Sequence, residues 1–368
     1  MSNTLTNPNK YRLAKSKYKL CLLIAAHDEE LVIRQTIESA INAGMSPTHI
    51  YVVDDNSSDN TREIAISLLG RNNVCRVRRS GKGVAITKAA KKFRLARRYK
   101  WIHLADADGG FMDDYFKIFR KSLRVKYAAA TGYISSFPGY GVSQYRVYEY
   151  TLGMEIQRRI QSMLKTIAII PGPTSCFRSD VFSKVNFASH ALCEDFDVTL
   201  QIHRKHLGEV QYIPKAHTYT QDPKDMSDFV KQITRWNRGV LQGMVKHKVG
   251  HKLQRIDAYL SIQVFQNFLF FINYFLIIPY VAIIRHSYVL ALYAFVYDVL
   301  LTFILTFIIA MKTERWDIMS AFPYIYLLRW INLFVFMRSF MDIYILRRHK
   351  MNTTNGIWGT GKRRYSIS

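Results

Sequence analysis

The sequence contains few cysteines, and none of them lie at metal-ligand spacing. The four cysteines are scattered through 368 residues without a CxxC pair. This gives no sign of a disulfide framework or a structural zinc site, and it fits a reducing compartment. Residues 1–19 are basic and lack the apolar core of a signal peptide. We therefore expect the segment that follows them to begin in the cytosol.

Acidic residues are also scarce, with 27 Asp and Glu against 52 Lys and Arg and a net charge of +25. Residues 71–100 hold twelve Lys or Arg and no acid. Such a surplus indicates an anionic partner: nucleic acid, acidic lipid or a phosphorylated substrate. No segment resembles a helix-turn-helix, an RNA-binding sheet motif or a zinc finger. We therefore expect no nucleic-acid partner and interpret the charge as adhesion to an anionic lipid bilayer.

Charge is missing altogether from residues 258–284, a run long enough to cross the roughly 30 Å hydrocarbon core of a bilayer. Residues 287–311 form a second apolar run, interrupted only by Asp298. A third run, 318–346, carries three charges: Arg329, Arg338 and Asp342. Because a charge at the bilayer centre costs about 2.5–3.5 kcal/mol, we expect two full spans and an interfacial or re-entrant third segment. Asp298 should then face protein or a polymer path instead of lipid.

Strand and helix signals alternate before these runs. Apolar segments that predict buried strands occupy residues 20–26, 49–55, 74–79 and 101–108. Helical periodicity fills the intervals between them, so the sequence predicts a Rossmann-like α/β domain with a mostly parallel sheet covered on both faces. We assign this domain to residues 20–245, the interfacial and transmembrane helices to 246–350, and a basic tail to 351–368.

Polar clusters follow each predicted strand: HDEE, DDNSSD, SGKG and DADGG. Ligands of such sheets bind beyond the carboxyl ends of the strands. We therefore expect the four clusters to converge on one site. The alternative for Asp106 and Asp108 is a solvated turn at the end of a strand.

These motifs, in this order, resemble those of glycosyltransferase family 2, and specifically its membrane-embedded processive polysaccharide synthases. The resemblance runs from LIAAHDEE to QITRW, most of residues 20–240. VVDDNSSDNT looks like the nucleotide-binding motif, DAD like the metal-binding DxD, CEDFDVTL like the motif that supplies the base, and QITRW like Q(Q/R)xRW. WGTGKRR, at 358–364, is similar to a C-terminal segment of hyaluronan and chitin synthases. The resemblance implies a GT-A fold and elongation and export of a β-linked polysaccharide from UDP-GlcNAc, with UDP-GlcA as a second donor if the product is of hyaluronan type.

The resemblance assigns one group of residues to the nucleotide sugar: Ala25, Asp54, Asp55, Lys82, Asp106, Gln232 and Arg235. Asp108 together with Asp106 would bind Mg²⁺ or Mn²⁺, which prefer oxygen ligands and substrate phosphates. Lys82 would reach a phosphate as a point charge. Alternatively, Asp54 and Asp55 only cap a turn, and Lys82 is a solvated lysine in a loop.

The resemblance also assigns the catalytic base, which lies on the acceptor side of the site. Asp195 is the expected base for the acceptor hydroxyl, with Glu194 orienting it, and Asp197 is expected to be solvated. On a helix, Gln232, Arg235 and Trp236 share one face. Arg235 would clamp the diphosphate, and Trp236 would present a flat surface to a sugar. The alternative for this pair is an interfacial position at the lipid headgroups.

Two further segments, a loop and the C-terminal tail, are expected to border the substrates. The loop PGPTSCF, at 171–177, would line the acceptor site through Thr174, Ser175 and Cys176, or it is an ordinary loop. The tail would close over the nucleotide as a gate, or it lies on the leaflet as a basic segment. The gating residues would be Trp358, Lys362, Arg363 and Arg364.

Three functions remain open from the sequence. The first is a processive synthase of the plasma membrane or bacterial inner membrane, with a cytosolic catalytic domain. The second is a single-transfer enzyme that glycosylates a polyprenyl phosphate. The third is a basic membrane scaffold without activity. The oligomeric state is left open.

Overall fold

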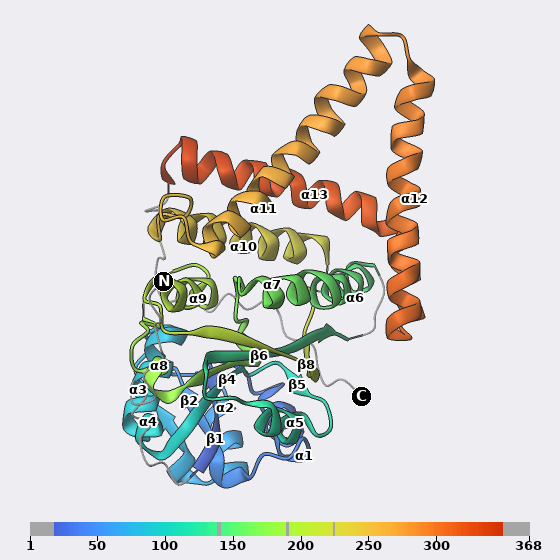
Figure 1. Cartoon of the computed structure of the whole chain (residues 1–368). Helices are drawn as coiled ribbons and strands as arrows, with labels where there is room; N and C mark the ends of the chain where they lie inside the picture. Colours follow the sequence, from blue (N-terminus) through green and yellow to red (C-terminus); the bar gives the residue numbers. More distant parts are fainter. Residues whose placement is uncertain (1–17, 138–140, 189–190, 224, 349–368) are drawn as a thin grey trace.

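A mixed eight-stranded sheet forms the base of the molecule in the computed structural model, which describes residues 18–137, 141–188, 191–223 and 225–348 (Figure 1). The strands are β1 (Tyr18–Ala26), β2 (Ile50–Asp54), β3 (Val74–Arg76), β4 (Tyr99–Asp106), β5 (Gly110–Phe111), β6 (Tyr127–Ser136), β7 (Ser175–Arg178) and β8 (Glu209–Thr220). Their order is β3-β2-β1-β4-β7-β6-β8-β5. The first four are parallel, and β7 runs against both of its neighbours, β4 and β6. The mostly parallel sheet predicted from the sequence is confirmed.

Helices cover both faces of the sheet, because its strands are apolar on both sides. Along β1, Cys21 and Leu23 pack into one core and Leu22 and Ile24 into the other. The first core is completed by α3 (Lys82–Lys92), α4 (Leu95–Arg98), α8 (Ser179–Phe182) and α9 (Glu194–Arg204). The second is completed by α1 (Ile33–Asn42), α2 (Thr61–Leu69) and α5 (Tyr115–Ser122).

A second helical layer lies over β6 and β8 (Figure 1). It contains α6 (Val142–Leu152), which continues through a π-helical turn, Gly153–Gln157, into α7 (Arg158–Leu164). Beyond it lies α10 (Met226–Lys246), which packs closely on the start of α9. A Cβ atom added at Gly239 would lie 2.9 Å from Cys193 Cβ, and one at Gly243 would lie 2.6 Å from the Phe196 ring. Only glycine fits at these two positions without displacing α9.

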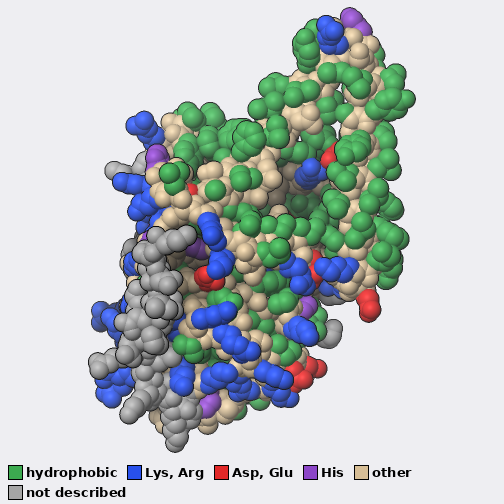
Figure 2. Space-filling model, viewed as in Figure 1, with side chains coloured by type: hydrophobic (Ala, Val, Ile, Leu, Met, Phe, Trp, Pro, Cys, Tyr) green, Lys and Arg blue, Asp and Glu red, His purple; other side chains and the backbone are tan. Residues whose placement is uncertain are grey.

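In the part of the chain that the structure describes, three helices after α10 are long and apolar enough to cross a membrane: 255–284, 288–313 and 316–345. They contain α11 (Arg255–Ile272), α12 (Tyr288–Thr313) and α13 (Phe322–Phe340). The helical segments 255–284 and 288–313 project from the body as a hairpin whose surface is largely hydrophobic, whereas α13 lies beside α10 and crosswise to α12 (Figures 1 and 2).

A polar contact joins the three apolar helices. Asp298 of α12 accepts a hydrogen bond from the Tyr274 hydroxyl at 2.5 Å and pairs with Arg329 of α13 at 3.3 Å. The Arg329 guanidinium also lies 4.1 Å from the centre of the Phe270 ring. Asp298 therefore faces protein, as expected from its cost in lipid.

The basic segment 71–100 lies away from the apolar hairpin. It forms β3, α3, α4 and the first residues of β4, at the end of the molecule opposite the hairpin tip (Figure 1). Part of its charge serves the fold, since Arg76 lies 3.4 Å from Asp54 and donates to the Ser57 carbonyl at 2.8 Å. This charge does not border the apolar helices, so their arrangement gives no support to its interpretation as membrane adhesion.

Candidate active site

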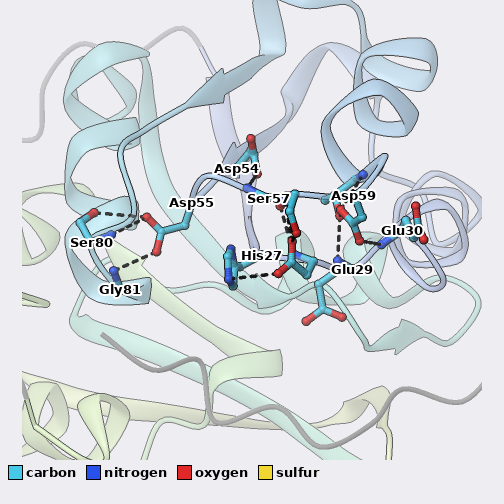
Figure 3. Close-up of polar contacts among 12 residues, drawn as sticks. His27, Glu29, Glu30, Asp54, Asp55, Ser57, Asp59, Ser80 and Gly81 are labelled. Carbon is cyan, nitrogen blue, oxygen red and sulfur yellow. Dashed lines mark hydrogen bonds and ion pairs between the residues drawn. The ribbon is translucent and has the colours of Figure 1, made fainter. Parts of the chain in front are cut away.

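The loops that follow β1 and β2 are held together by carboxylates that accept backbone hydrogen bonds (Figure 3). Asp28 accepts from the Ser58 N–H at 2.7 Å, and Glu30 accepts from the Asn60 N–H at 3.0 Å. In the reverse direction, the Glu30 N–H donates to Asp59 at 3.0 Å. These acids fix the edge of the sheet on which the predicted site lies.

Asp54 and Asp55 are both fully buried and both organise loops. Asp54 accepts from the Ser57 N–H at 2.8 Å. Asp55 accepts from the backbone N–H groups of Ser80 and Gly81 at 2.9 and 2.8 Å, which fixes the loop that leads into α3 (Figure 3). The turn-capping geometry is thus present, and base recognition by these residues stays a prediction.

Lys82 links the end of β4, where the sequence predicted it to converge with Asp106, to the start of α9. Its Nζ lies 2.6 Å from Asp106 Oδ1 at the end of β4 and 3.2 Å from Glu194 Oε1 at the start of α9. Burial alone would lower the pKa of Lys82, but Asp106, Glu194 and Asp195 raise it well above its ordinary value. The ammonium therefore stays charged, and it is not the solvated loop lysine of the alternative interpretation.

Gly172, in the loop 171–177, gives this ion pair room. A Cβ atom added there would lie 2.7 Å from Asp106 Oδ2 and 3.1 Å from Lys82 Nζ. The loop therefore closes directly over the charged groups, and its backbone approach requires a residue without a side chain.

Asp195 has the properties expected of a base. Burial and the neighbouring Glu194 raise its pKa to about 6, although Lys82, the Phe196 N–H and Arg235 act in the opposite direction. The Phe196 N–H donates to Asp195 Oδ1 at 2.8 Å and orients the carboxylate. A carboxylate with a raised pKa accepts a proton more readily than an ordinary one.

Two recesses meet at this cluster. The larger has Lys82, Glu194, Asp195 and Ser175 in its wall. The smaller is lined by Asp106 and the glycines of the DADGG motif. Asp106, in the wall of the smaller recess, forms an ion pair with Lys82, in the wall of the larger one.

Asp108 follows Asp106 by two residues, and its charge acts on Tyr150 of α6. Burial, together with the charges of Asp222, Glu149 and Asp108, raises the pKa of Tyr150 on α6. Within the described residues, no three His, Cys, Asp or Glu side chains converge as a metal site. A divalent cation held here would therefore take Asp106 and Asp108 together with oxygen atoms of its substrate.

Trp236 and Gln232 of α10 are both contacted by Arg146 of α6, a residue that the motifs did not indicate. Gln232 Oε1 accepts a hydrogen bond from the Arg146 guanidinium, whose Cζ lies 4.7 Å from the Trp236 ring centre. Arg235 lies near the segment that leads into α9, with its Nη1 3.5 Å from the Leu192 carbonyl oxygen. Its positive charge opposes the rise in the pKa of Asp195.

The expectation that Asp197 is solvated is wrong. Asp197 is fully buried and accepts from Lys246 at 2.7 Å, His247 at 2.8 Å and Gln201 at 2.8 Å. These contacts tie the end of α10 to α9. Lys246 and His247 lie 49 and 50 residues later in the chain, so the local sequence gave no sign of these two partners.

The other predicted residues lie at different depths. Ser175 lines the larger recess, whereas Thr174 is fully buried and bonded to Thr131 at 2.8 Å. Cys176 is fully buried in the core beneath the sheet, and Ala25 is fully buried on β1 in register with Asp106. The thiol of Cys176 therefore gives no support to acceptor contact. The gating residues Trp358, Lys362, Arg363 and Arg364 lie outside the described residues.

A family described as "Glycosyltransferase like family 2" matches residues 19–239, which is more than half of the chain. The chain belongs to glycosyltransferase family 2. The match covers every motif from the β1 end to QITRW, so the recesses around Lys82 and Asp195 lie within the family domain.

Curated relatives of this family 2 glycosyltransferase include bacterial synthases. It is 26% identical over 277 residues to a probable glycosyltransferase, YdaM, of Bacillus subtilis (strain 168), covering 70% of this chain and 63% of that one. It is 25% identical over 247 residues to a poly-β-1,6-N-acetyl-D-glucosamine synthase of Staphylococcus epidermidis, covering 63% of this chain and 58% of that one. The chain thus spans about three fifths of the length of these relatives.

A solved structure extends the likeness beyond the sheet. The mannosyltransferase PcManGT from Pyrobaculum calidifontis, in complex with GDP-Man and Mn²⁺, superposes with a TM-score of 0.54 at 14% identity. The match covers 92% of this chain and 91% of that one. The GT-A fold implied by the sequence motifs of this family 2 glycosyltransferase is therefore confirmed.

Proposed function

We propose that this family 2 glycosyltransferase is a membrane-bound, inverting enzyme that transfers N-acetylglucosamine from UDP-GlcNAc to a growing β-linked polysaccharide. The observation that carries the proposal is the partly buried Asp195, with a pKa raised to about 6, beside Lys82 in one recess. The donor follows from the relatives that are named as poly-β-1,6-N-acetyl-D-glucosamine synthases. We place the enzyme in a plasma or bacterial inner membrane, with the catalytic domain in the cytosol.

The chemistry assigned to Asp195 is proton removal. As the acceptor hydroxyl attacks the anomeric carbon, its proton passes to an oxygen of Asp195 while the bond from that carbon to the UDP oxygen breaks. Direct attack inverts the anomeric centre, so an α-linked donor gives a β-linked product. Lys82 and Arg235 stabilise the diphosphate that leaves with the bonding electrons.

A divalent cation fits the remaining acids. Asp106 and Asp108 offer oxygen ligands only, the set that Mg²⁺ and Mn²⁺ prefer when phosphates complete the coordination. When bound, the cation would neutralise charge on the leaving diphosphate. On donor binding, the Lys82 ammonium would exchange its contact with Asp106 for one with a phosphate.

Labelled donors test the proposal. The full chain in lipid nanodiscs should be incubated with single UDP-sugars and with pairs, and any polymer digested with linkage-specific glycosidases. We expect UDP-GlcNAc alone to give a polymer that a β-N-acetylhexosaminidase degrades. A requirement for UDP-GlcA would indicate a hyaluronan-type product, and failure of all UDP-sugars would contradict the proposal.

A single transfer to a polyprenyl phosphate is the second candidate. It is favoured by the small membrane region, because the described residues contain three helices long and apolar enough to span a bilayer and we expect only two of them to cross it fully. Product length separates the two candidates, because a single-transfer enzyme adds one sugar to a lipid phosphate and makes no polymer.

A further inference from the structure

A buried arginine connects α6 to the helix that carries the QITRW motif. Arg146 is only 1% exposed, although it lies next to the candidate site. Burial alone would lower its pKa, but Glu149 more than offsets this and raises the pKa above its ordinary value. The guanidinium is therefore a permanent positive charge inside the protein.

Four side chains hold this guanidinium in one orientation. Glu149 and Gln232 accept hydrogen bonds from its two terminal nitrogens. The Phe229 and Trp236 rings lie with their centres 4.7 Å from its Cζ. Phe229, Gln232 and Trp236 all belong to α10, so one arginine fixes three side chains on one helix.

The chemistry of the guanidinium suits this arrangement. It is planar, donates in two directions within its plane and stacks on aromatic rings with its faces. Lysine carries the same charge but cannot both stack and bond in this way. The geometry therefore depends on arginine and not on positive charge alone.

We infer that Arg146 is a positioning residue, which fixes Gln232 and Trp236 so that the acceptor sugar meets the site in a reactive orientation. The inference rests on the proposed function, and it moves Gln232 from the nucleotide sugar, to which the sequence motif assigned it, to the acceptor side, because Gln232 and Trp236 both contact Arg146. Arg146 acts through the side chains of α10, whereas the ion pair between Lys82 and Asp106, the residues proposed to contact the donor, does not involve it.

The experiment compares Arg146→Met and Arg146→Lys with wild type in nanodiscs. Three quantities are measured: transfer from UDP-GlcNAc to triacetylchitotriose, hydrolysis of UDP-GlcNAc without acceptor, and calorimetric affinity for UDP. Because a displacement of about 1 Å can cost 100-fold in rate, we expect Arg146→Met to lower transfer about 100-fold. Donor hydrolysis and UDP affinity should stay within about twofold, since neither uses the acceptor. Arg146→Lys should resemble Arg146→Met.

Arg159→Met is the matched control. Arg159 lies on α7 in the same helical segment, is partly exposed and pairs with Glu155 at 3.1 Å. We expect it to transfer at the wild-type rate. Equal losses of transfer, hydrolysis and UDP affinity in Arg146→Met would show a general structural defect and overturn the inference. Rescue of transfer by Arg146→Lys would do the same.

Direct binding of triacetylchitotriose separates this inference from the proposed function, because it needs no turnover. We expect wild type to bind the oligosaccharide and Arg146→Met to lose that binding. Wild-type transfer that Arg146→Met leaves intact would overturn only the inference. A wild-type protein that neither binds nor glycosylates the oligosaccharide would overturn both proposals.

Discussion

The protonation of Asp195, the proposed base, should be visible in the pH dependence of the reaction. Transfer requires the carboxylate form, so the rate should rise through pH 6 and level off above it. Glu194 is the neighbouring charge that helps to hold the pKa up. We therefore expect Glu194→Gln to move the inflection to lower pH, measured as transfer rate between about pH 4.5 and 7.5 (about 1.5 units either side). An inflection that stays in place would assign it to another group.

Removal of the Asp195 carboxylate separates proton transfer from donor binding. We expect Asp195→Asn to lower transfer by at least about 100-fold, the usual contribution of a positioned base. UDP affinity should be retained, because the donor contacts are assigned to other residues. Calorimetry with UDP checks this, and an affinity that collapses together with turnover would show that the role is misassigned.

The paired aspartates of the DADGG motif predict a metal requirement. We expect Asp108→Asn and excess chelator each to abolish transfer, because both remove the cation that neutralises the diphosphate. Added Mn²⁺ should restore the chelated wild type but not Asp108→Asn. Asp113→Asn, at an exposed position five residues later, is the control and should retain the rate. Full activity in chelator would contradict the assignment.

The sequence predicted the charged centre of the site better than its surroundings. Lys82, Asp106, Glu194 and Asp195 each adjoin the end of a strand or the start of a helix, so their motifs show them locally. Arg146 could not be found in this way. Its partner Gln232 lies 86 residues away, and only tertiary packing makes an arginine on α6 a buried residue.

At the scale of elements, the contact between α9 and α10 controls where the acids lie. A Cβ atom at Gly239 would come within 3.0 Å of the Cys193 backbone nitrogen, next to Glu194. We expect Gly239→Ala to cost about 1–3 kcal/mol in the free energy of unfolding and to slow transfer. Chemical denaturation and transfer assays measure both effects.

Gly153→Ala is the matched control for this substitution. Gly153 is also helical, and a Cβ atom added there meets nothing within 4 Å. Alanine should stabilise the protein slightly, by up to about 1 kcal/mol, because it is the better helix former. If both substitutions behaved alike, packing at Gly239 would not matter.

Element prediction from the sequence was accurate for the parallel half of the sheet. The predicted strand 101–108 is observed as Tyr99–Asp106, and 20–26 lies within Tyr18–Ala26. The antiparallel insertion of β7 between β4 and β6 was not predicted. Its pairing joins segments about 70 residues apart, and hydrophobic periodicity carries no information on such partners.

At the scale of the whole molecule, the position of α13 decides whether the chain crosses the membrane two or three times. It lies beside α10, which is held to the segment after α13 by an ion pair between Arg238 and Asp342 (Figure 1). The chain after it is basic, and basic segments favour the cytosolic side. We therefore predict two spans, with α13 on the cytosolic face of the bilayer.

Cysteine labelling tests this topology. The four native cysteines are buried and should give little background. We expect Ser287→Cys, between α11 and α12, to react with an impermeant reagent on intact cells. Ser320→Cys and Leu346→Cys should react only after permeabilisation. Labelling of Leu346→Cys from outside would establish a third span.

The order of elements along the chain has a consequence for synthesis. β8 completes the sheet at Thr220, 35 residues before the first apolar helix begins at Arg255. A ribosome therefore finishes the whole sheet before any hydrophobic helix emerges to engage the insertion machinery. During that interval α10 is made without α13, its later packing partner, and exposes apolar side chains such as Ile233. Chaperones should therefore bind most strongly to nascent chains that contain α10 but not yet α13.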